Sequence, residues 1–318
     1  MKTHKHLWDE YISDSNIDLA IRNVCKHKTS RKKFRELRER PERYKNWIRK
    51  EAEDYHNSPH LPIEIYDGIQ RKKRTIIVPT FREQIVHHMI INILNPIIMK
   101  PMYEKSYGSL PGRGAHLARQ DIERVIKTDR RNVKYCLKMD VRKYFDSVPH
   151  SILKEKMAAK IKDERFLSLL YEIVDVTDKG IPLGFYTSQW IANWYLSDLD
   201  HYIKEQLRAK HYYRYMDDMV IFGANKKELH DMRAKIKGEL HKLGLEMKDN
   251  WQVFRFDYIK DGKHYGRDLD FMGFRFFATG LSCAEASCIR RPVKRERSRK
   301  RRNRLCTTPD RCCLISDG

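Results

Sequence analysis

The spacing of hydrophobic residues changes along the chain and predicts helices first and strands later. Residues 1–60 are rich in charge and typical of helices, and a linker is expected at 57–62. Residues 63–80 then alternate and contain β-branched side chains on either side of Asp67-Gly68. Because this dipeptide is a strong hairpin signal, we predict a two-stranded ribbon there. From Phe81 to Met99 the apolar positions return to helical spacing.

The middle of the chain continues this mixture. A second helix is predicted at 115–128, and an alternating strand at 133–139 ends directly on Asp140. A further helix is expected from about Pro149, since proline suits a helical first turn. Another helix is expected to run through Asp200.

The last part of the chain predicts more strands. A strand pair is expected at 211–222, interrupted at 216–218, followed by a helix at about 226–243 and a late strand at 271–277. Helices and strands do not alternate regularly. The pattern therefore predicts the α+β fold class.

Composition narrows the classes of partner. The 318 residues carry 65 Lys and Arg against 43 Asp and Glu, a net charge of +22. Such a surplus favours a polyanion such as nucleic acid, although a generally basic surface would give the same count. No run of about 18 apolar residues is present, and the N-terminus turns acidic where a signal peptide would be apolar. We therefore expect a soluble, cytoplasmic chain with no membrane partner.

Three carboxylates are the strongest chemical signal. Asp217 and Asp218 lie between two apolar strands, and Asp140 ends a third. If these strands pair, all three carboxylates meet at one end of a sheet. Adjacent anions favour a hard cation, and three carboxylates suit two Mg²⁺ ions for phosphoryl transfer. An ordinary acidic turn is the alternative interpretation of Asp217-Asp218.

The order of motifs resembles that of reverse transcriptases over about residues 60–280. The resemblance is carried by the basic ribbon with Phe81-Arg82-Glu83-Gln84, Ser106-Tyr107-Gly108 with Pro111-Gly112-Arg113, Lys138-Met139-Asp140 to Phe145-Asp146, Leu183-Gly184 to Ser188-Gln189, Tyr215-Met216-Asp217-Asp218, Leu243-Gly244-Leu245 with Lys248, and Phe271-Met272-Gly273-Phe274. Each motif alone is a weak or moderate signal. Their common order and spacing make a chance match very improbable.

This resemblance implies a right-hand polymerase fold with fingers and palm. The expected parts are an N-terminal helical extension (1–60), fingers (61–132), palm (133–280), and a basic C-terminal segment (281–318). Only about 40 residues follow Phe277, so we expect a thumb that is short, absent or atypical.

The resemblance also implies roles for individual residues. Asp140, Asp217 and Asp218 would be catalytic, and these three with Val141 would bind two Mg²⁺ ions, with Mn²⁺ as a substitute. Nucleotide contacts are implied for Lys72, Lys73, Arg74, Tyr144, Phe145, Leu183, Gly184, Gln189 and Lys248. Template or primer contacts are implied for Arg82, Arg113, Tyr215, Met216, Phe271, Met272 and Gly273. Arg82 is also a candidate for a structural ion pair. Phe145 would exclude a ribose 2′-hydroxyl, which favours dNTPs over rNTPs.

One departure from the common pattern indicates a subgroup. Many relatives have Gln-Gly followed by Ser-Pro, where this chain has Leu183-Gly184 and Ser188-Gln189. This pattern resembles the enzymes of diversity-generating retroelements. It implies error-prone cDNA synthesis and a small, basic, oligomeric accessory protein besides the RNA template, the DNA or RNA primer and dNTPs. Retron, group II intron and phage-defence reverse transcriptases remain alternatives. Outside this chemistry, an RNA polymerase or a catalytically weak RNA-binding protein remains open.

Overall fold

A computed structural model describes residues 3–26, 28, 30–67, 72–280 and 282–284. The helices are α1 (Leu7–Tyr11), α2 (Asp14–Val24), α3 (Lys32–Glu39), α4 (Glu42–Glu53), α5 (Phe81–Met99), α6 (Ala115–Thr128), α7 (Tyr144–Ser147), α8 (His150–Lys160), α9 (Glu164–Val174), α10 (Tyr186–Tyr195), α11 (Ser197–His201), the π-helix η1 (Tyr202–Gln206) and α12 (Lys226–Lys242). The strands are β1 (Ile63–Asp67), β2 (Lys72–Ile76), β3 (Tyr135–Met139), β4 (His211–Tyr215), β5 (Asp218–Gly223), β6 (Gln252–Arg255), β7 (Tyr258–Lys260), β8 (Lys263–Tyr265), β9 (Leu269–Phe271), β10 (Phe274–Phe276) and β11 (Ser282–Ala284). The α+β prediction is confirmed.

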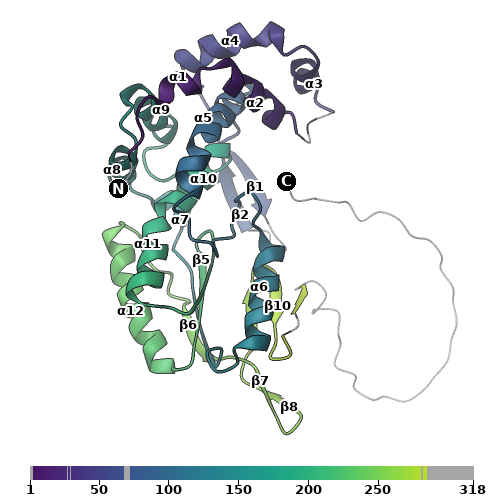
Figure 1. Cartoon of the computed structure of the whole chain (residues 1–318), viewed down its shortest axis with the longest axis vertical. Coiled ribbons are helices and arrows are strands. Elements are labelled where there is room, and N and C mark those ends of the chain that lie inside the picture. Colours follow the sequence, from purple (N-terminus) through teal and green to yellow (C-terminus); the bar gives the residue numbers. More distant parts are fainter. Residues whose placement is uncertain (1–2, 27, 29, 68–71, 281, 285–318) are drawn as a thin grey trace, which may run out of the picture.

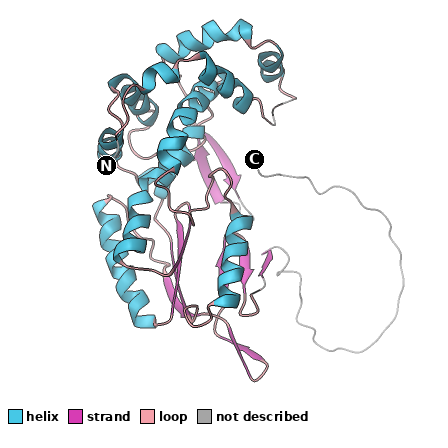
Figure 2. Ribbon diagram, in the orientation of Figure 1, coloured by secondary structure: helices cyan, strands magenta, loops and turns pink. Residues whose placement is uncertain are grey.

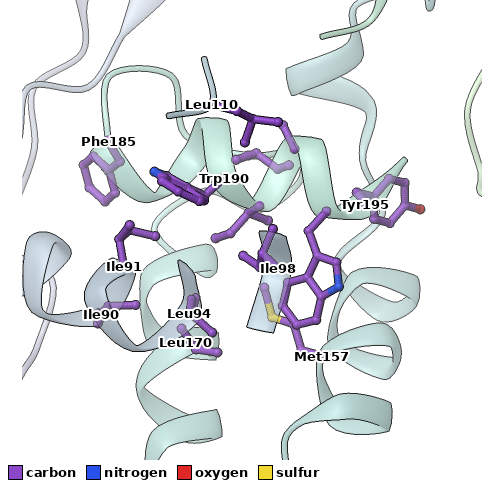
Figure 3. Packing of buried hydrophobic residues seen from close by; sticks show 14 of the residues in the cluster. Ile90, Ile91, Leu94, Ile98, Leu110, Met157, Leu170, Phe185, Trp190 and Tyr195 are labelled. Carbon is purple, nitrogen blue, oxygen red and sulfur yellow. The ribbon is translucent and has the colours of Figure 1, made fainter. Parts of the chain in front are cut away.

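Helix α5 is the centre of the upper half of the molecule. Thr80 and Glu83 form a capping box that fixes its first turn, and Glu83 is fully buried. The helices α1, α2 and α4 pack against α5, and Figure 1 shows them gathered around it. Figure 3 shows Ile91 of α5 close to Phe185 and Trp190, and Leu94 of α5 beside Leu170 of α9; all five belong to one hydrophobic cluster. The N-terminal helices therefore share one hydrophobic cluster with α5, α10 and one face of the sheet.

The lower half is built on a four-stranded antiparallel sheet of order β4-β5-β3-β6. Successive residues of β5 point into different hydrophobic clusters: Ile221 faces α10 and α12, while Val220 and Phe222 face α6 and the β9–β10 hairpin. Both faces of the sheet are thus covered, as the arrangement of helices and strands in Figure 2 also shows. This double burial explains why β5 is apolar at consecutive positions.

The hairpin at 269–276 corrects one sequence prediction. The expected single strand at 271–277 is two strands, β9 and β10, joined at Met272 and Gly273. Both turn residues have positive φ, 56° and 75°, as a two-residue turn requires. Met-Gly is not a usual turn dipeptide, so the run of Phe271 to Phe277 resembled one strand.

The predicted part boundaries fall between secondary-structure elements, and they stay a prediction. The C-terminal segment lies outside the described residues except for β11. In the described part of the chain, no helix is both long and apolar enough to span a bilayer.

Candidate active site

The three candidate carboxylates meet at one edge of the four-stranded sheet. Antiparallel pairing sets Met139 opposite Met219, so Asp140 follows β3 beside the start of β5. Burial, and then the neighbouring Asp140, raises the pKa of Asp217 to about 7 and that of Asp218 to about 6. The structure thus brings together the three side chains that the sequence singled out.

The donor set fits a divalent cation in its chemistry. Asp140 Oδ1 is buried and has no hydrogen-bond partner, and carboxylate oxygens are the preferred ligands of Mg²⁺. The three carboxylates share this edge without forming a ready metal site: among the described residues, no group of three or more His, Cys, Asp or Glu side chains is placed so that it could hold an ion. Val141 has a buried aliphatic side chain, so only its backbone carbonyl could contribute to the predicted ligation.

Lys248 is part of this cluster. Its Nζ lies 2.9 Å from Asp140 Oδ2, and its backbone N–H donates to the Asp140 carbonyl at 2.8 Å. The ion pair with Asp140 raises the pKa of Lys248, which therefore carries a positive charge in direct contact with this carboxylate. Lys248, which the sequence assigned to the nucleotide, thus lies directly beside a candidate metal ligand.

A sharp end to α12 places Lys248. Gly244 has a φ of 66°. Its N–H donates to the His241 carbonyl, and the Leu245 N–H donates to the Leu240 carbonyl. These bonds form a Schellman motif, which reverses the chain direction. Met247 then forms a bridge with Val141, and the next residue reaches Asp140.

A buried ion pair holds the turn between β4 and β5. Arg214 and Asp200 are both fully buried, with bonds of 2.7 and 2.6 Å between the guanidinium and the two carboxylate oxygens. Arg214 Nη1 also donates to the Met216 carbonyl and to Asn193 Oδ1, each at 3.0 Å. Met216 itself has a φ of 54°, a conformation that costs energy for a non-glycine residue. Arg214 therefore stabilises the turn that presents Asp217.

The loop before α6 supports the same turn from the other side. The Tyr107 N–H donates to the Arg214 carbonyl at 2.8 Å, and a Cβ at Gly108 would lie 2.6 Å from the Met216 nitrogen. Asn193 Nδ2 donates to the Gly108 carbonyl at 2.8 Å. Only glycine fits this close approach.

The predicted nucleotide loop is joined to the ribbon. The Ile77 N–H donates to the Leu183 carbonyl at 2.7 Å, and Gly184 has a φ of 107° with the Ile77 carbonyl where a Cβ would lie. Leu183 is half-buried and Gln189 is exposed. This contact fixes the position of the loop relative to β2, and the nucleotide contacts stay a prediction.

The two aromatic residues after Asp140 differ in their surroundings. Tyr144 is buried, and its hydroxyl donates to the Ala192 carbonyl at 2.6 Å. Its side chain therefore belongs to the core, and the contact of Tyr144 with the nucleotide stays a prediction. Phe145 is only half-buried, so part of its ring is available beside the site.

The basic residues of the β1–β2 ribbon differ in their surroundings. Lys73 pairs with Glu64 at 2.7 Å, and Arg74 is half-buried opposite Ile65. The side chain of Lys72 lies outside the described part of the structure. Contacts of this ribbon with a triphosphate stay a prediction.

Arg82 and Arg113 both have partners within the protein, and their assignment to the template or primer stays a prediction. Arg82 pairs with Glu51 of α4 at 3.0 Å and donates to the His56 carbonyl; the structural alternative expected an acid of the fingers as its partner. Arg113 Nη1 donates to the carbonyls of Tyr103 and Ser106. Both guanidinium groups therefore hold the fold together.

The predicted primer grip is a turn with one buried anchor. Phe271 is buried against α6 and the sheet, while Gly273 is exposed at the tip beside Met272. Lys138 donates to the Asp270 carbonyl at 2.6 Å and joins this hairpin to β3. Of the three residues predicted to contact the template or primer here, Phe271 thus has its ring packed in the core. Tyr215 and Met216 belong to the β4–β5 turn described above.

Sequence reasoning missed the support of the site. Asp200, Asn193 and Arg214 lie on three elements and have no shared motif, so no local signal could join them. Buried polar residues within apolar segments, such as Asn193 inside α10, were the one available sign.

A family model described as "Reverse transcriptase (RNA-dependent DNA polymerase)" matches residues 59–276. The chain therefore belongs to the reverse transcriptase family. Among curated relatives, the Protein YkfC of Escherichia coli is 24% identical over 60% of this chain and 61% of its own. The Group II intron-encoded protein LtrA of Lactococcus lactis is 26% identical over 61% of this chain and 33% of its own. The Retron Ec73 reverse transcriptase of E. coli is 25% identical over 64% and 66%.

Among solved structures, the apo telomerase of Candida tropicalis truncated from its C-terminal domain superposes with a TM-score of 0.52. It is 14% identical, covering 75% of this chain and 58% of that chain, so the likeness concerns the fold alone. This chain spans less than two thirds of the length of each relative named here.

The raised pKa of Asp217 predicts a stability that depends on pH. Ionised Asp217 destabilises the metal-free fold, fully above pH about 7 and less as the pH falls toward the ordinary aspartate range. We expect Asp217→Asn to raise the free energy of unfolding by about 1–3 kcal/mol at pH 8, and by less than half of that at pH 5. Urea unfolding of both proteins at pH 8 and at pH 5 measures this difference in the free energy of unfolding. The control is Asp231→Asn, an exposed carboxylate on α12. A gain as large at pH 5 as at pH 8 would contradict this cause.

The buried ion pair predicts that Arg214 cannot be replaced by lysine. An ammonium cannot span both Asp200 oxygens, Asn193 and the Met216 carbonyl. We expect Arg214→Lys to lower the free energy of unfolding by about 2–4 kcal/mol. Arg49→Lys, at an exposed pair with Asp14, should cost under about 1 kcal/mol. Equal costs for the two variants would show that the fork geometry of Arg214 does not matter.

Proposed function

We propose that this chain is an RNA-directed DNA polymerase that adds dNTPs to a primer 3′-hydroxyl on an RNA template. The observation that carries the proposal is the edge where Asp140, Asp217 and Asp218 meet, with the pKa values of Asp217 and Asp218 raised. Membership of the reverse transcriptase family supports the same reaction. A carboxylate cluster of this kind is costly without a cation, which favours a metal-dependent site over an ordinary acidic turn.

Asp140 and Asp217 would hold two Mg²⁺ ions, with Asp218 supporting them. When bound, the ions would lower the pKa of the primer hydroxyl and neutralise charge on the triphosphate. Mn²⁺ could replace them because it also prefers oxygen ligands. The free Asp140 Oδ1 is the first ligand atom available.

Lys248 has two roles in this proposal. In the metal-free protein its ammonium compensates the charge of Asp140. With nucleotide bound, its half-exposed Nζ would be free to turn toward the leaving pyrophosphate and donate a proton. The backbone bond between Lys248 and Asp140 would keep the side chain near the site during this change.

Phe145 would select the sugar. Its ring stands beside buried Tyr144, 5.6 Å from that ring, and Tyr144 is fixed by its bond to α10. A ring supported in this way cannot easily withdraw, so it would exclude a ribose 2′-hydroxyl. This favours dNTPs and separates the proposal from an RNA polymerase.

We further propose the finer assignment to error-prone synthesis in a diversity-generating retroelement, with a small basic accessory protein as partner. It rests on Leu183 and Ser188-Gln189. An aliphatic Leu183 offers the incoming sugar no hydrogen bond, and selectivity that rests on small free-energy differences would then fall. The retron and group II intron relatives keep those two systems as alternatives, and both are bacterial in this set, which suits a cytoplasmic enzyme.

Primer extension tests the reaction. The wild-type chain should extend a DNA primer on an RNA template with dNTPs and Mg²⁺, and Asp217→Asn should reduce the rate at least about 100-fold. Asp231→Asn should leave the rate unchanged. Replacing dNTPs by rNTPs should stop synthesis by the wild type, and Phe145→Ala should allow it.

Two outcomes would redirect the proposal. Faster synthesis with rNTPs by the wild type would indicate an RNA polymerase. RNA binding without synthesis, even after addition of cell extract, would indicate an RNA-binding protein on a polymerase scaffold.

The Leu183 hypothesis predicts a change in fidelity. Leu183→Gln leaves the backbone bond to Ile77 in place and adds a hydrogen-bond donor, so we expect about tenfold fewer misincorporations. Leu183→Met, which stays apolar, is the matched control. Sequencing of the cDNA measures both. An error rate equal to that of the wild type would exclude Leu183 as the cause.

A further inference from the structure

A basic pocket lies at the end of the four-stranded sheet opposite the carboxylates. It has a volume of about 200 Å³ and is lined by residues that include Arg130, Lys134, Arg255 and Tyr258. Lys134 precedes β3, and Asp140 follows it. At ~3.3 Å per residue, the pocket is roughly 20 Å from the candidate active site. It is therefore a separate site.

The pocket has an excess of positive charge. Arg130 and Lys134 are exposed, and neither has a carboxylate partner among the described residues. The one acid in the lining, Asp257, is nearly buried and already accepts bonds from His264 and from the Ala278 N–H. The cations are thus available to an anion from outside.

Aromatic rings continue the pocket onto the β7–β8 hairpin. Tyr258 and Tyr265 stack with ring centroids 5.6 Å apart, yet 37% and 43% of their surfaces remain exposed. Arg255 lies over the Tyr258 ring at 4.9 Å, and Lys260 and Lys263 are exposed at the hairpin end. Figure 1 shows that this hairpin projects from the end of the molecule farthest from α4.

We propose that the pocket and the β7–β8 hairpin bind single-stranded RNA. The pocket cations hold a backbone phosphate, and Tyr258 with Tyr265 stacks an unpaired base. The cavity is smaller than the ~300–1,000 Å³ that encloses a whole small molecule, so it suits one group of a longer polymer. Cations interleaved with exposed aromatic rings are typical of single-strand binding, because a paired base cannot reach the rings.

This site anchors RNA away from the carboxylate edge. RNA binding at this site does not depend on polymerase activity, so it can be measured without dNTPs or Mg²⁺. Failure of the RNA-binding proposal therefore leaves the polymerase proposal intact, and the reverse also holds. An RNA strand held there would remain attached while its other end occupies or leaves the active site.

Fluorescence anisotropy with a labelled unstructured RNA of about 16 nucleotides tests the proposal. Arg130→Glu with Lys134→Glu should weaken binding about tenfold at 0.1 M salt and reduce the salt slope by about 1.4. The matched control, Lys235→Glu with Lys237→Glu on exposed positions of α12, changes the net charge equally and should weaken binding about twofold at most.

A second variant separates stacking from charge. Tyr258→Leu with Tyr265→Leu should weaken single-stranded binding several-fold and leave duplex RNA binding unchanged. Unchanged thermal unfolding would show that both double variants fold. RNA carrying 4-thiouridine should cross-link to residues 258–265 in the wild type.

Three results would overturn the proposal: equal losses in the charge variant and its control, cross-links only near the carboxylate edge, or loss of duplex binding equal to that of single strands in the tyrosine variant. A glutamate-rich peptide that displaces the RNA from this hairpin at equal concentration would assign the surface to a protein partner instead.

Discussion

The buried pair of Arg214 and Asp200 is the constraint on which the candidate site depends. A fully desolvated ion pair is tolerated only when its remaining donors and acceptors are satisfied, and here Asn193, Tyr212 and the Met216 carbonyl satisfy them. The same bonds hold Met216 in its left-handed conformation. Because Asp217 and Asp218 follow directly, the polar network in the core decides where the carboxylates lie. Stability and chemistry are therefore joined through one guanidinium group.

At the carboxylate edge, in contrast to the Arg214–Asp200 pair, negative charge is not fully compensated by partners within the protein. Burial and the neighbouring carboxylates raise the pKa values of Asp217 and Asp218, and Lys248 offsets part of the negative charge through its ion pair with Asp140. The sheet that carries these carboxylates is well packed, because hydrophobic clusters cover both of its faces. A well-packed sheet can support a strained turn and uncompensated charge at its edge. This is the arrangement expected of a site that binds cations and phosphates.

Charge is distributed over more than this edge. The opposite end of the same sheet carries cations and exposed tyrosines, about one strand length away. Arg82 and Arg113, which the sequence assigned to nucleic acid, form hydrogen bonds within the protein. A net charge of +22 thus indicates that a polyanion is favoured as a partner, but it does not indicate which basic side chains contact that polyanion. Partners within the fold decide which side chains remain available.

The sequence by itself indicated the strands β1 to β5, the α+β class and the three candidate carboxylates, but not the strands β6, β7 and β8. Helical spacing predicted α5 and α6 at their observed bounds, because local periodicity follows from burial on one face. The tertiary structure alone decided the β9–β10 turn, where Met272 adopts a positive φ without a turn signal, and the partners of Arg214, Lys248 and Arg82. These contacts join residues far apart in the chain, and their energies depend on burial, which no local pattern records.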